Sequence, residues 1–223
     1  MTSRNGRDMT TVADSRSTRR DRRPRTRIQT ANRQIILDAA LQVFAASGFR
    51  GATVDRIAAQ AGMSKPNLLY YFRSKDEIYR QVLESTLATW LAPLERLDPA
   101  GDPIAEIAGY IRHKLEMSRQ MPEASRLFAN EVLHGAPAIG EFLRGPLRDL
   151  VARKAAVIRG WIDEGRLAPV DPVHLIFMIW ATTQHYADFD VQVRAVLGEQ
   201  GDTVAAAEET VLAVFLNGLR PRR

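Results

Sequence analysis

The sequence predicts an all-α fold, in which a small N-terminal unit of helices precedes a larger C-terminal helical domain. Two observations support this prediction. Apolar residues recur at helical spacing through most of the chain, and few segments alternate as a strand would. Prolines and glycines fall between the periodic segments, where helices end. We expect a disordered basic arm over residues 1–30, a first helical domain over 31–75 and a second over 76–223.

The composition is that of a folded protein without thiol chemistry. Apolar residues make up 45% of the 223 residues, enough to bury a substantial core. The absence of cysteine excludes disulfides, thiolate zinc sites and cysteine nucleophiles. There is no apolar run of about 18 residues, so no transmembrane helix is expected. The N-terminus is basic but lacks the apolar stretch of a secretory signal, and we therefore expect a cytoplasmic protein.

Charge is distributed unevenly along the chain. Residues 1–33 hold ten arginines and three aspartates, a net charge of +7, which leaves −2 for the other residues within the total of +5. A strongly basic arm on a slightly acidic body indicates a polyanionic partner contacted near the N-terminus. The same composition is also typical of a solvated, disordered tail, and the two interpretations are compatible.

Residues 53–72 predict two short helices joined by a tight turn. Thr53 is suited to cap the first helix and Ser64 the second. Gly62 can adopt the left-handed conformation that ends a helix. Pro66 falls in the first turn of the second helix, where its missing N–H costs nothing. The pattern is a helix-turn-helix, whose second helix is a candidate for reading the edges of DNA bases.

Further helices follow from periodicity and from the residues that interrupt it. A stripe from Ile35 to Phe44 predicts a helix that ends near Gly48. Ser74 caps a long helix from Lys75 to about Leu91, which we expect Pro93 to stop. The other predicted helices span about 103–120, 122–134, 138–165, 171–197 and 203–219.

The segment from Ile35 to Tyr79 resembles the DNA-binding domain of the TetR family of one-component repressors. The matching positions are Ala39, Ala40, Phe44, Gly48, Phe49, Thr53, Ile57, Ala58, Ala61, Gly62, Ser64, Lys65, Leu69, Tyr70, Tyr71, Phe72, Ser74 and Lys75. The resemblance implies a TetR-like architecture, with a three-helix helix-turn-helix domain over 31–75 for DNA binding. It implies a helical bundle over 76–223 for ligand binding and dimerisation, and a homodimer on a palindromic double-stranded DNA operator.

Four C-terminal runs resemble a member of this family that regulates pyrimidine utilisation. They are residues 90–93, 122–128, 167–172 and 174–189. This resemblance implies a repressor whose DNA binding is relieved by uracil, or more weakly by thymine, without a cofactor, a metal or a membrane partner. A repressor of the same type that responds to another planar aromatic or hydrophobic effector is the nearest alternative. A helical enzyme acting on a small pyrimidine is a remote one, because the chain offers no nucleophile–base pair, phosphate loop or metal cluster.

The second helix of the motif offers polar side chains to a DNA groove. Asparagine can bond an adenine edge, lysine can reach guanine or phosphate, and tyrosine can contact a thymine methyl group. Thr53 and Lys75, at the starts of neighbouring helices, are suited to contact phosphates, although they could equally be a cap and a surface charge. The predicted DNA-binding residues are Thr53, Ser64, Lys65, Asn67, Tyr70, Tyr71 and Lys75. Phe72 is expected to face the core together with Leu68 or Leu69.

Three residues are candidates to bind the effector by the same resemblance. Trp180 and Gln184 stand at i and i+4 and share a helix face, and Trp90 ends the long helix that begins beside the reading helix. A carboxamide can pair with the alternating C=O and N–H groups of a pyrimidine dione, and a tryptophan face suits its flat ring. Without the resemblance, these residues would be read as core. Weaker candidates for the wall of the site are Phe128, Phe177 and Tyr186.

Other polar residues are interpreted as structural. His185 and Asp188, at i and i+3, supply only two potential metal ligands, so we read them as satisfied polar groups. The same interpretation applies to Arg126 and Glu131. The last two long helices predict the dimer surface, because their apolar residues exceed what one core requires: Leu175, Ile176, Ile179, Val211, Leu212 and Phe215.

Overall fold

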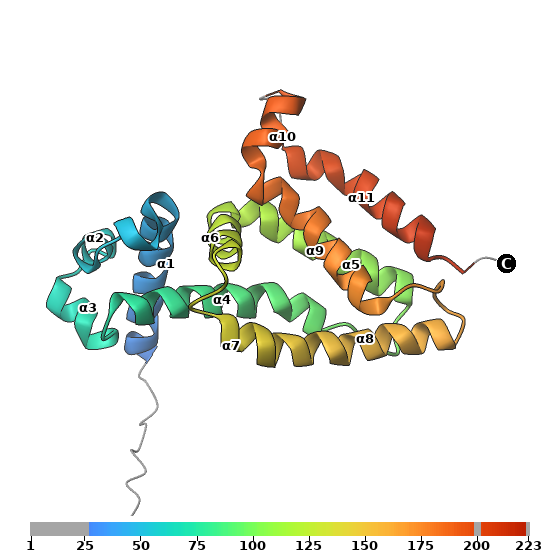
Figure 1. Cartoon of the computed structure of the whole chain (residues 1–223), viewed down its shortest axis with the longest axis horizontal. Coiled ribbons are helices and arrows are strands. Elements are labelled where there is room, and N and C mark those ends of the chain that lie inside the picture. The colour runs from blue at the N-terminus through green and yellow to red at the C-terminus, as the bar shows by residue number, and fades with distance from the viewer. Residues whose placement is uncertain (1–26, 199–201, 222–223) are drawn as a thin grey trace, which may run out of the picture.

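A computed structural model describes residues 27–198 and 202–221 of the chain. Every regular element within these residues is helical, which confirms the predicted all-α class. Figure 1 shows a small head of three helices at one end of a larger body, with helix α4 (Lys75–Glu95) running from the head into the body. The predicted arm over residues 1–30 lies outside the described residues up to position 26.

The head consists of α1 (Arg27–Gly51), α2 (Val54–Gln60) and α3 (Lys65–Tyr71). The caps form as predicted: the Thr53 hydroxyl accepts from the backbone N–H of Arg56 at 3.2 Å, and the Ser64 hydroxyl accepts from that of Asn67 at 3.4 Å. Gly62 adopts a φ of 67° in the turn, a conformation that a side chain would strain. These local interactions set α3 at a fixed angle to α2.

Helix α1 begins earlier than the sequence predicts. Residues 27–30, assigned to the disordered arm, form its first turn. The reason lies in contacts with α3, since the Gln29 amide donates to the Tyr70 hydroxyl at 3.4 Å and the Asn32 amide donates to the Tyr71 hydroxyl at 2.8 Å. At the other end, Gly48 leaves the helical conformation as expected, with a φ of 65°.

Helix α4 belongs to two apolar cores. Its N-terminal part, up to Leu87, joins the head core. This core consists of Ile36, Ala40, Val43, Phe44, Ala52, Ile57, Ala58, Leu68, Phe72, Ile78, Tyr79, Val82, Leu83, Leu87, Leu127, Ala136 and Ile139. Leu94, near its end, joins the body core, defined as the buried apolar residues of α5, α8, α9 and α11 with Leu94, Leu97 and Leu167. Leu91 packs against both cores. The predicted stop at Pro93 is wrong, because α4 continues to Glu95 and buries Pro93 itself.

The body contains α5 (Pro103–Gln120), α6 (Pro122–Leu133), α8 (Arg148–Asp163), α9 (Pro172–Asp188), α10 (Asp190–Leu197) and α11 (Thr203–Leu219). Two predicted helices are interrupted. The 138–165 helix begins with one short turn, α7 (Gly140–Phe142), and a π-helical segment (Leu143–Leu147) where Pro146 removes a backbone donor. The 171–197 helix breaks at Phe189, whose φ of −115° and ψ of 30° turn the chain.

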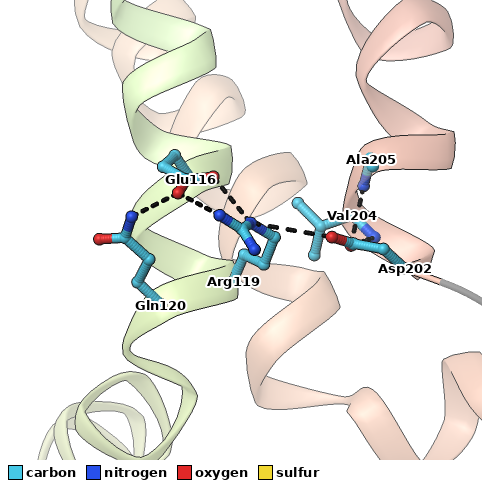
Figure 2. Close-up of polar contacts among 6 residues, drawn as sticks. All are labelled: Glu116, Arg119, Gln120, Asp202, Val204 and Ala205. Atoms are coloured by element: carbon cyan, nitrogen blue, oxygen red, sulfur yellow. Dashed lines mark hydrogen bonds and ion pairs between the residues drawn. The ribbon is translucent and has the colours of Figure 1, made fainter.

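Helices α5, α9 and α11 pack side by side in the body. A polar link also joins α5 to the start of α11 (Figure 2). Arg119 binds Glu116 on its own helix and forms an ion pair with Asp202 at 3.7 Å. Asp202 in turn caps α11 by accepting from the N–H groups of Val204 and Ala205. The Arg119 guanidinium holds the pKa of the Glu116 carboxyl below its usual value.

Candidate functional site

Helix α3 presents its polar side chains to solvent. Leu68 and Phe72 are fully buried in the head core, whereas Leu69 is 39% exposed. Of the two leucines that the sequence offers, Leu68 is therefore the one that faces the core with Phe72. Asn67 is exposed, and its side chain forms no hydrogen bond within the described part of the chain. The Lys65 ammonium is also exposed and pairs with the Asp55 carboxylate of α2 at 3.0 Å.

The two tyrosines of α3 differ in their surroundings. Tyr70 is 71% exposed, and its ring meets that of Tyr71 edge-on at 5.1 Å. Tyr71 is half-buried and anchored from α1, because Asn32 donates to its hydroxyl and Arg33 donates to its carbonyl at 2.7 Å. A hollow of about 250 Å³ lies between these tyrosines and the residues of α1 that face them, Gln29 and Arg33. The start of α1 is therefore part of the same surface as α3.

Thr53 and Lys75 have structural roles as well as positions near α3. Thr53 is the cap of α2 and stays exposed. The Lys75 ammonium donates to the carbonyls of Phe49 at 2.7 Å and Ala52 at 2.9 Å, and lies 4.4 Å from the Phe49 ring centroid. This ammonium ties the end of α1 to the start of α4. A lysine ammonium has three donors, so one N–H of Lys75 is left for a phosphate oxygen.

Trp90 lies where the head core and the body core meet. Its side chain is 4% exposed, yet it is a member of neither core. Its ring meets Phe128 of α6 in an edge-on contact at 5.6 Å. The indole Nε1 is buried and, alone among the buried side-chain N and O atoms of the described residues, has no hydrogen-bond partner. Buried indole N–H groups normally find an acceptor, so the site holds an unused donor.

Lys114 of α5 faces this tryptophan and was not predicted from the sequence. Its side chain is 4% exposed, and its ammonium lies 5.0 Å from the Trp90 ring centroid. Burial lowers the pKa of Lys114 to about 8, although the negative charge of Asp188 acts in the opposite direction. Charged groups are seldom buried without a partner, so this cation marks the site as unusual.

The remaining predicted effector residues lie on α9. Trp180 is half-buried, and its indole N–H donates to the hydroxyl of the buried Tyr110 on α5. Phe177 contacts the Trp180 ring at 5.7 Å but is 45% exposed. Gln184 is half-buried, and its amide forms no hydrogen bond to any described residue. Tyr186 is half-buried and packs against the body core.

The structure thus places the predicted effector residues in two groups, Trp90 with Phe128 and Trp180 with Phe177. Lys114 contacts Trp90 of the first group, and it stands on α5 four residues after Tyr110, which contacts Trp180 of the second. A second hollow, of about 150 Å³, lies between α4 and α5 and includes Tyr110 in its lining. Neither this hollow nor the one beside α3 is lined by Trp90, Trp180 or Gln184.

The polar residues read as structural do have partners. The buried Glu131 carboxylate accepts from the Tyr79 hydroxyl at 3.1 Å and from the Ala138 N–H at 2.6 Å. Asp188 accepts from the Ser125 hydroxyl, and Arg126 donates to the Ala187 carbonyl. His185 stacks on Phe189 at 5.0 Å. Over residues 27–198 and 202–221, no three His, Asp or Glu side chains gather as they would around a metal ion.

The sequence matches known families over nearly all of the described length. Residues 36–82 match the model of the tetR family of bacterial regulatory proteins, and residues 83–222 match that of the C-terminal region of YcdC-like proteins. The chain belongs to the TetR family. The boundary between the two TetR models falls inside α4, the helix that the two cores share.

Relatives of this TetR-family chain are regulators. The transcriptional regulator RutR of Escherichia coli K12 is 50% identical over 201 residues, covering 89% of this chain and 95% of that protein. The repressor SCO4008 of Streptomyces coelicolor is 28% identical over 173 residues, covering 77% of this chain and 86% of that protein. The regulator FadR of Bacillus halodurans shares the fold, with a TM-score of 0.63 at 21% identity over 86% of this chain and 97% of its own. The protein is therefore a transcription regulator and not an enzyme.

The six apolar residues predicted for a TetR dimer surface lie in the body core of a single chain. Each is at most 9% exposed, because α9 and α11 turn these faces toward α5 and α8. The exposed large apolar residues of these two helices are Phe177, Met178 and Val214. If α9 and α11 form the dimer surface, these three residues are its apolar part. None of the helices in the described ranges combines the length and apolar character needed to cross a membrane.

Proposed function

We propose that the protein is a homodimeric repressor of genes for pyrimidine utilisation, released from a palindromic operator by uracil or, more weakly, thymine. The resemblance to a pyrimidine-utilisation regulator supports this assignment, as does the 50% identity with RutR over most of both chains. The observation that carries it is the buried Trp90 at the far end of α4, with an aromatic neighbour and an unused N–H donor. A flat ring with carbonyl acceptors fits such a site.

Two helices connect this site to the head. Helix α4 begins beside α3 and reaches Trp90 after about 23 Å, at 1.5 Å per residue. Helix α6 packs against both α1 and α9. It brings Phe128 to Trp90 and Glu131 to Tyr79. A ring bound against Trp90 would shift α4 and α6 together, and a coupling of about 1–3 kcal/mol is enough to weaken operator binding 5- to 150-fold.

The test is release of DNA by the effector. Fluorescence anisotropy would follow the wild-type protein on a palindrome that it selects in vitro, with and without uracil. Uracil that neither binds the protein nor loosens it from this DNA would refute the proposal. A thermal-shift screen of nucleobases against hydrophobic amphiphiles separates the nearest alternative, because only a ligand of the folded state raises the midpoint.

The Gln184→Ala variant is expected to weaken uracil binding by about 1–3 kcal/mol, since the carboxamide would lose its hydrogen bonds to the ring. Operator affinity should stay nearly unchanged, because Gln184 lies on α9, away from the head. Calorimetry with uracil measures the effect, and Gln120→Ala at the exposed end of α5 is the matched control. Unchanged uracil affinity would remove Gln184 from the site.

The Asn67→Ala variant is expected to lose about 1–3 kcal/mol of operator affinity while keeping its affinity for random DNA. The exposed side chain of Asn67 has no partner among the described residues and is suited to an adenine edge. Anisotropy titrations on the selected palindrome and on a scrambled duplex measure the two affinities, with Asn130→Ala on α6 as the control. Equal losses on both duplexes would make Asn67 a positioning contact only.

A further inference from the structure

Lys114 is a buried residue whose ammonium has no hydrogen-bond or ion-pair partner among the described residues. Its ammonium carries three N–H groups, and within the residues that the structure describes it forms neither a hydrogen bond nor an ion pair within 4 Å. Its contact is the face of the Trp90 ring, at 5.0 Å from the centroid. A cation–π contact compensates only part of the cost of removing an ammonium from water. The arrangement leaves a strong hydrogen-bond donor over the face of the Trp90 ring, whose own indole N–H is also unused.

The position of Lys114 on α5 explains where this donor points. Tyr110, Lys114 and Ser118 stand at i, i+4 and i+8 and share one face of the helix. The first and third of these residues bind α9: the Tyr110 hydroxyl accepts from Trp180, and the Ser118 hydroxyl donates to the Thr183 carbonyl at 2.9 Å. Lys114 therefore lies between two α5–α9 contacts and reaches Trp90 of α4.

We propose that Lys114 is the residue that selects a 4-oxo pyrimidine over a 4-amino pyrimidine, by donating from its ammonium to a ring carbonyl oxygen. The inference rests on the proposed function and names the feature of the effector that the site reads. The side chains of Lys114 and Trp90 are both donors, and neither is an acceptor. A ring that presents carbonyl oxygens pairs with them, whereas the amino group of cytosine would face another donor.

The electrostatics of the site agree with this role. With a pKa near 8, Lys114 remains mostly protonated at neutral pH and so keeps its donor character. Asp188 of α9 provides a compensating negative charge while it accepts from Ser125 of α6. A site that reads a substrate by buried hydrogen bonds discriminates strongly, because a mismatched ring leaves buried polar groups unpaired.

The experiment is calorimetry of uracil and cytosine on wild-type, Lys114→Met and Lys114→Gln proteins at pH 7. Lys114→Met is expected to lower uracil affinity by about 10- to 100-fold, because a charge-assisted hydrogen bond is lost. It should also reduce the preference for uracil over cytosine. Lys114→Gln is expected to shift the ratio further toward cytosine, since a carboxamide can turn its oxygen toward an amino group. Lys154→Met, on α8 in the same domain, is the control and should bind as the wild type does.

The outcomes distinguish this inference from the proposed function. If the wild-type protein binds no uracil, the proposed function fails. If it binds uracil and both Lys114 variants keep its affinity and its uracil-to-cytosine ratio, the inference on Lys114 is overturned while the proposed function stands. Reduced affinity for both rings with an unchanged ratio also overturns it, because Lys114 would then support the site without reading the ring.

Discussion

The Lys114→Met variant is expected to be more stable than the effector-free wild-type protein, by about 3 kcal/mol in the free energy of unfolding at pH 7. Burial lowers the pKa of Lys114 from 10.5 to about 8, and each pKa unit corresponds to about 1.4 kcal/mol. Methionine has a similar length and no charge to bury. Urea denaturation at matched protein concentration measures the difference, because the stability of a dimer depends on concentration.

The pH dependence of this effect has a definite sign. Below pH 8 the ammonium is protonated in both the folded and the unfolded protein, so the full cost of burying the charge is present. Between pH 8 and about 10.5 the unfolded chain binds more protons than the folded one, so the stability of the wild type rises relative to the variant. The gap should therefore close as the pH approaches 10.5. A variant that is less stable at pH 7 would show that Lys114 contributes to the fold rather than straining it.

The Glu131→Ala variant is expected to lower the free energy of unfolding by about 3 kcal/mol. The carboxylate accepts two buried hydrogen bonds, from Tyr79 and from the Ala138 N–H, and each bond to a charged group contributes about 1.5 kcal/mol or more. Its removal would leave both donors unpaired. Burial, and after it the neighbouring Glu131 carboxylate, raises the pKa of the Tyr79 hydroxyl, which keeps that hydroxyl as a donor throughout the accessible pH range.

Glu131 also links two helices of the molecule. Its bond to Tyr79 joins α6 to the start of α4, which supports the reading helix. We therefore expect uracil to release DNA less effectively from Glu131→Ala, even where the variant still binds uracil. Tyr79→Phe removes one of the two bonds and should lose about half as much stability. Denaturation together with anisotropy on the selected palindrome checks both effects, and full release by uracil would contradict the connecting role.

The sequence predicts the head well because its structure depends on neighbouring residues. Thr53, Gly62 and Ser64 act within three or four positions of themselves, so caps and turn follow directly from the local pattern. The ends of the body helices depend on distant contacts. Pro93 removes a donor only near the end of α4, where packing of Leu94 and Leu97 into the body core outweighs the loss.

The proposed effector site also depends on contacts between residues far apart in the sequence. Trp90 and Phe128 are recognisable as a pair only through resemblance, because they lie on different helices. The sequence does contain an indication that Lys114 is buried, because this lysine stands on the apolar face of α5 among Ile107, Ile111 and Leu115. A lysine at such a position packs its aliphatic stem among the apolar side chains. Its approach to Trp90 follows from packing between α4 and α5, which helical spacing alone does not specify.

Continuity of α4 has a geometric consequence for the regulator. Because the helix runs unbroken from Lys75 past Trp90, a rotation at Trp90 would move the whole segment as a rigid body. A tilt of about 10° at the aromatic end would displace the other end by about 4 Å over its length of about 23 Å. That displacement exceeds the step of about 3.4 Å between successive base pairs. In the proposed dimer, a small angular adjustment around one bound ring would thus be enough to put the two symmetry-related reading helices out of register with their half-sites.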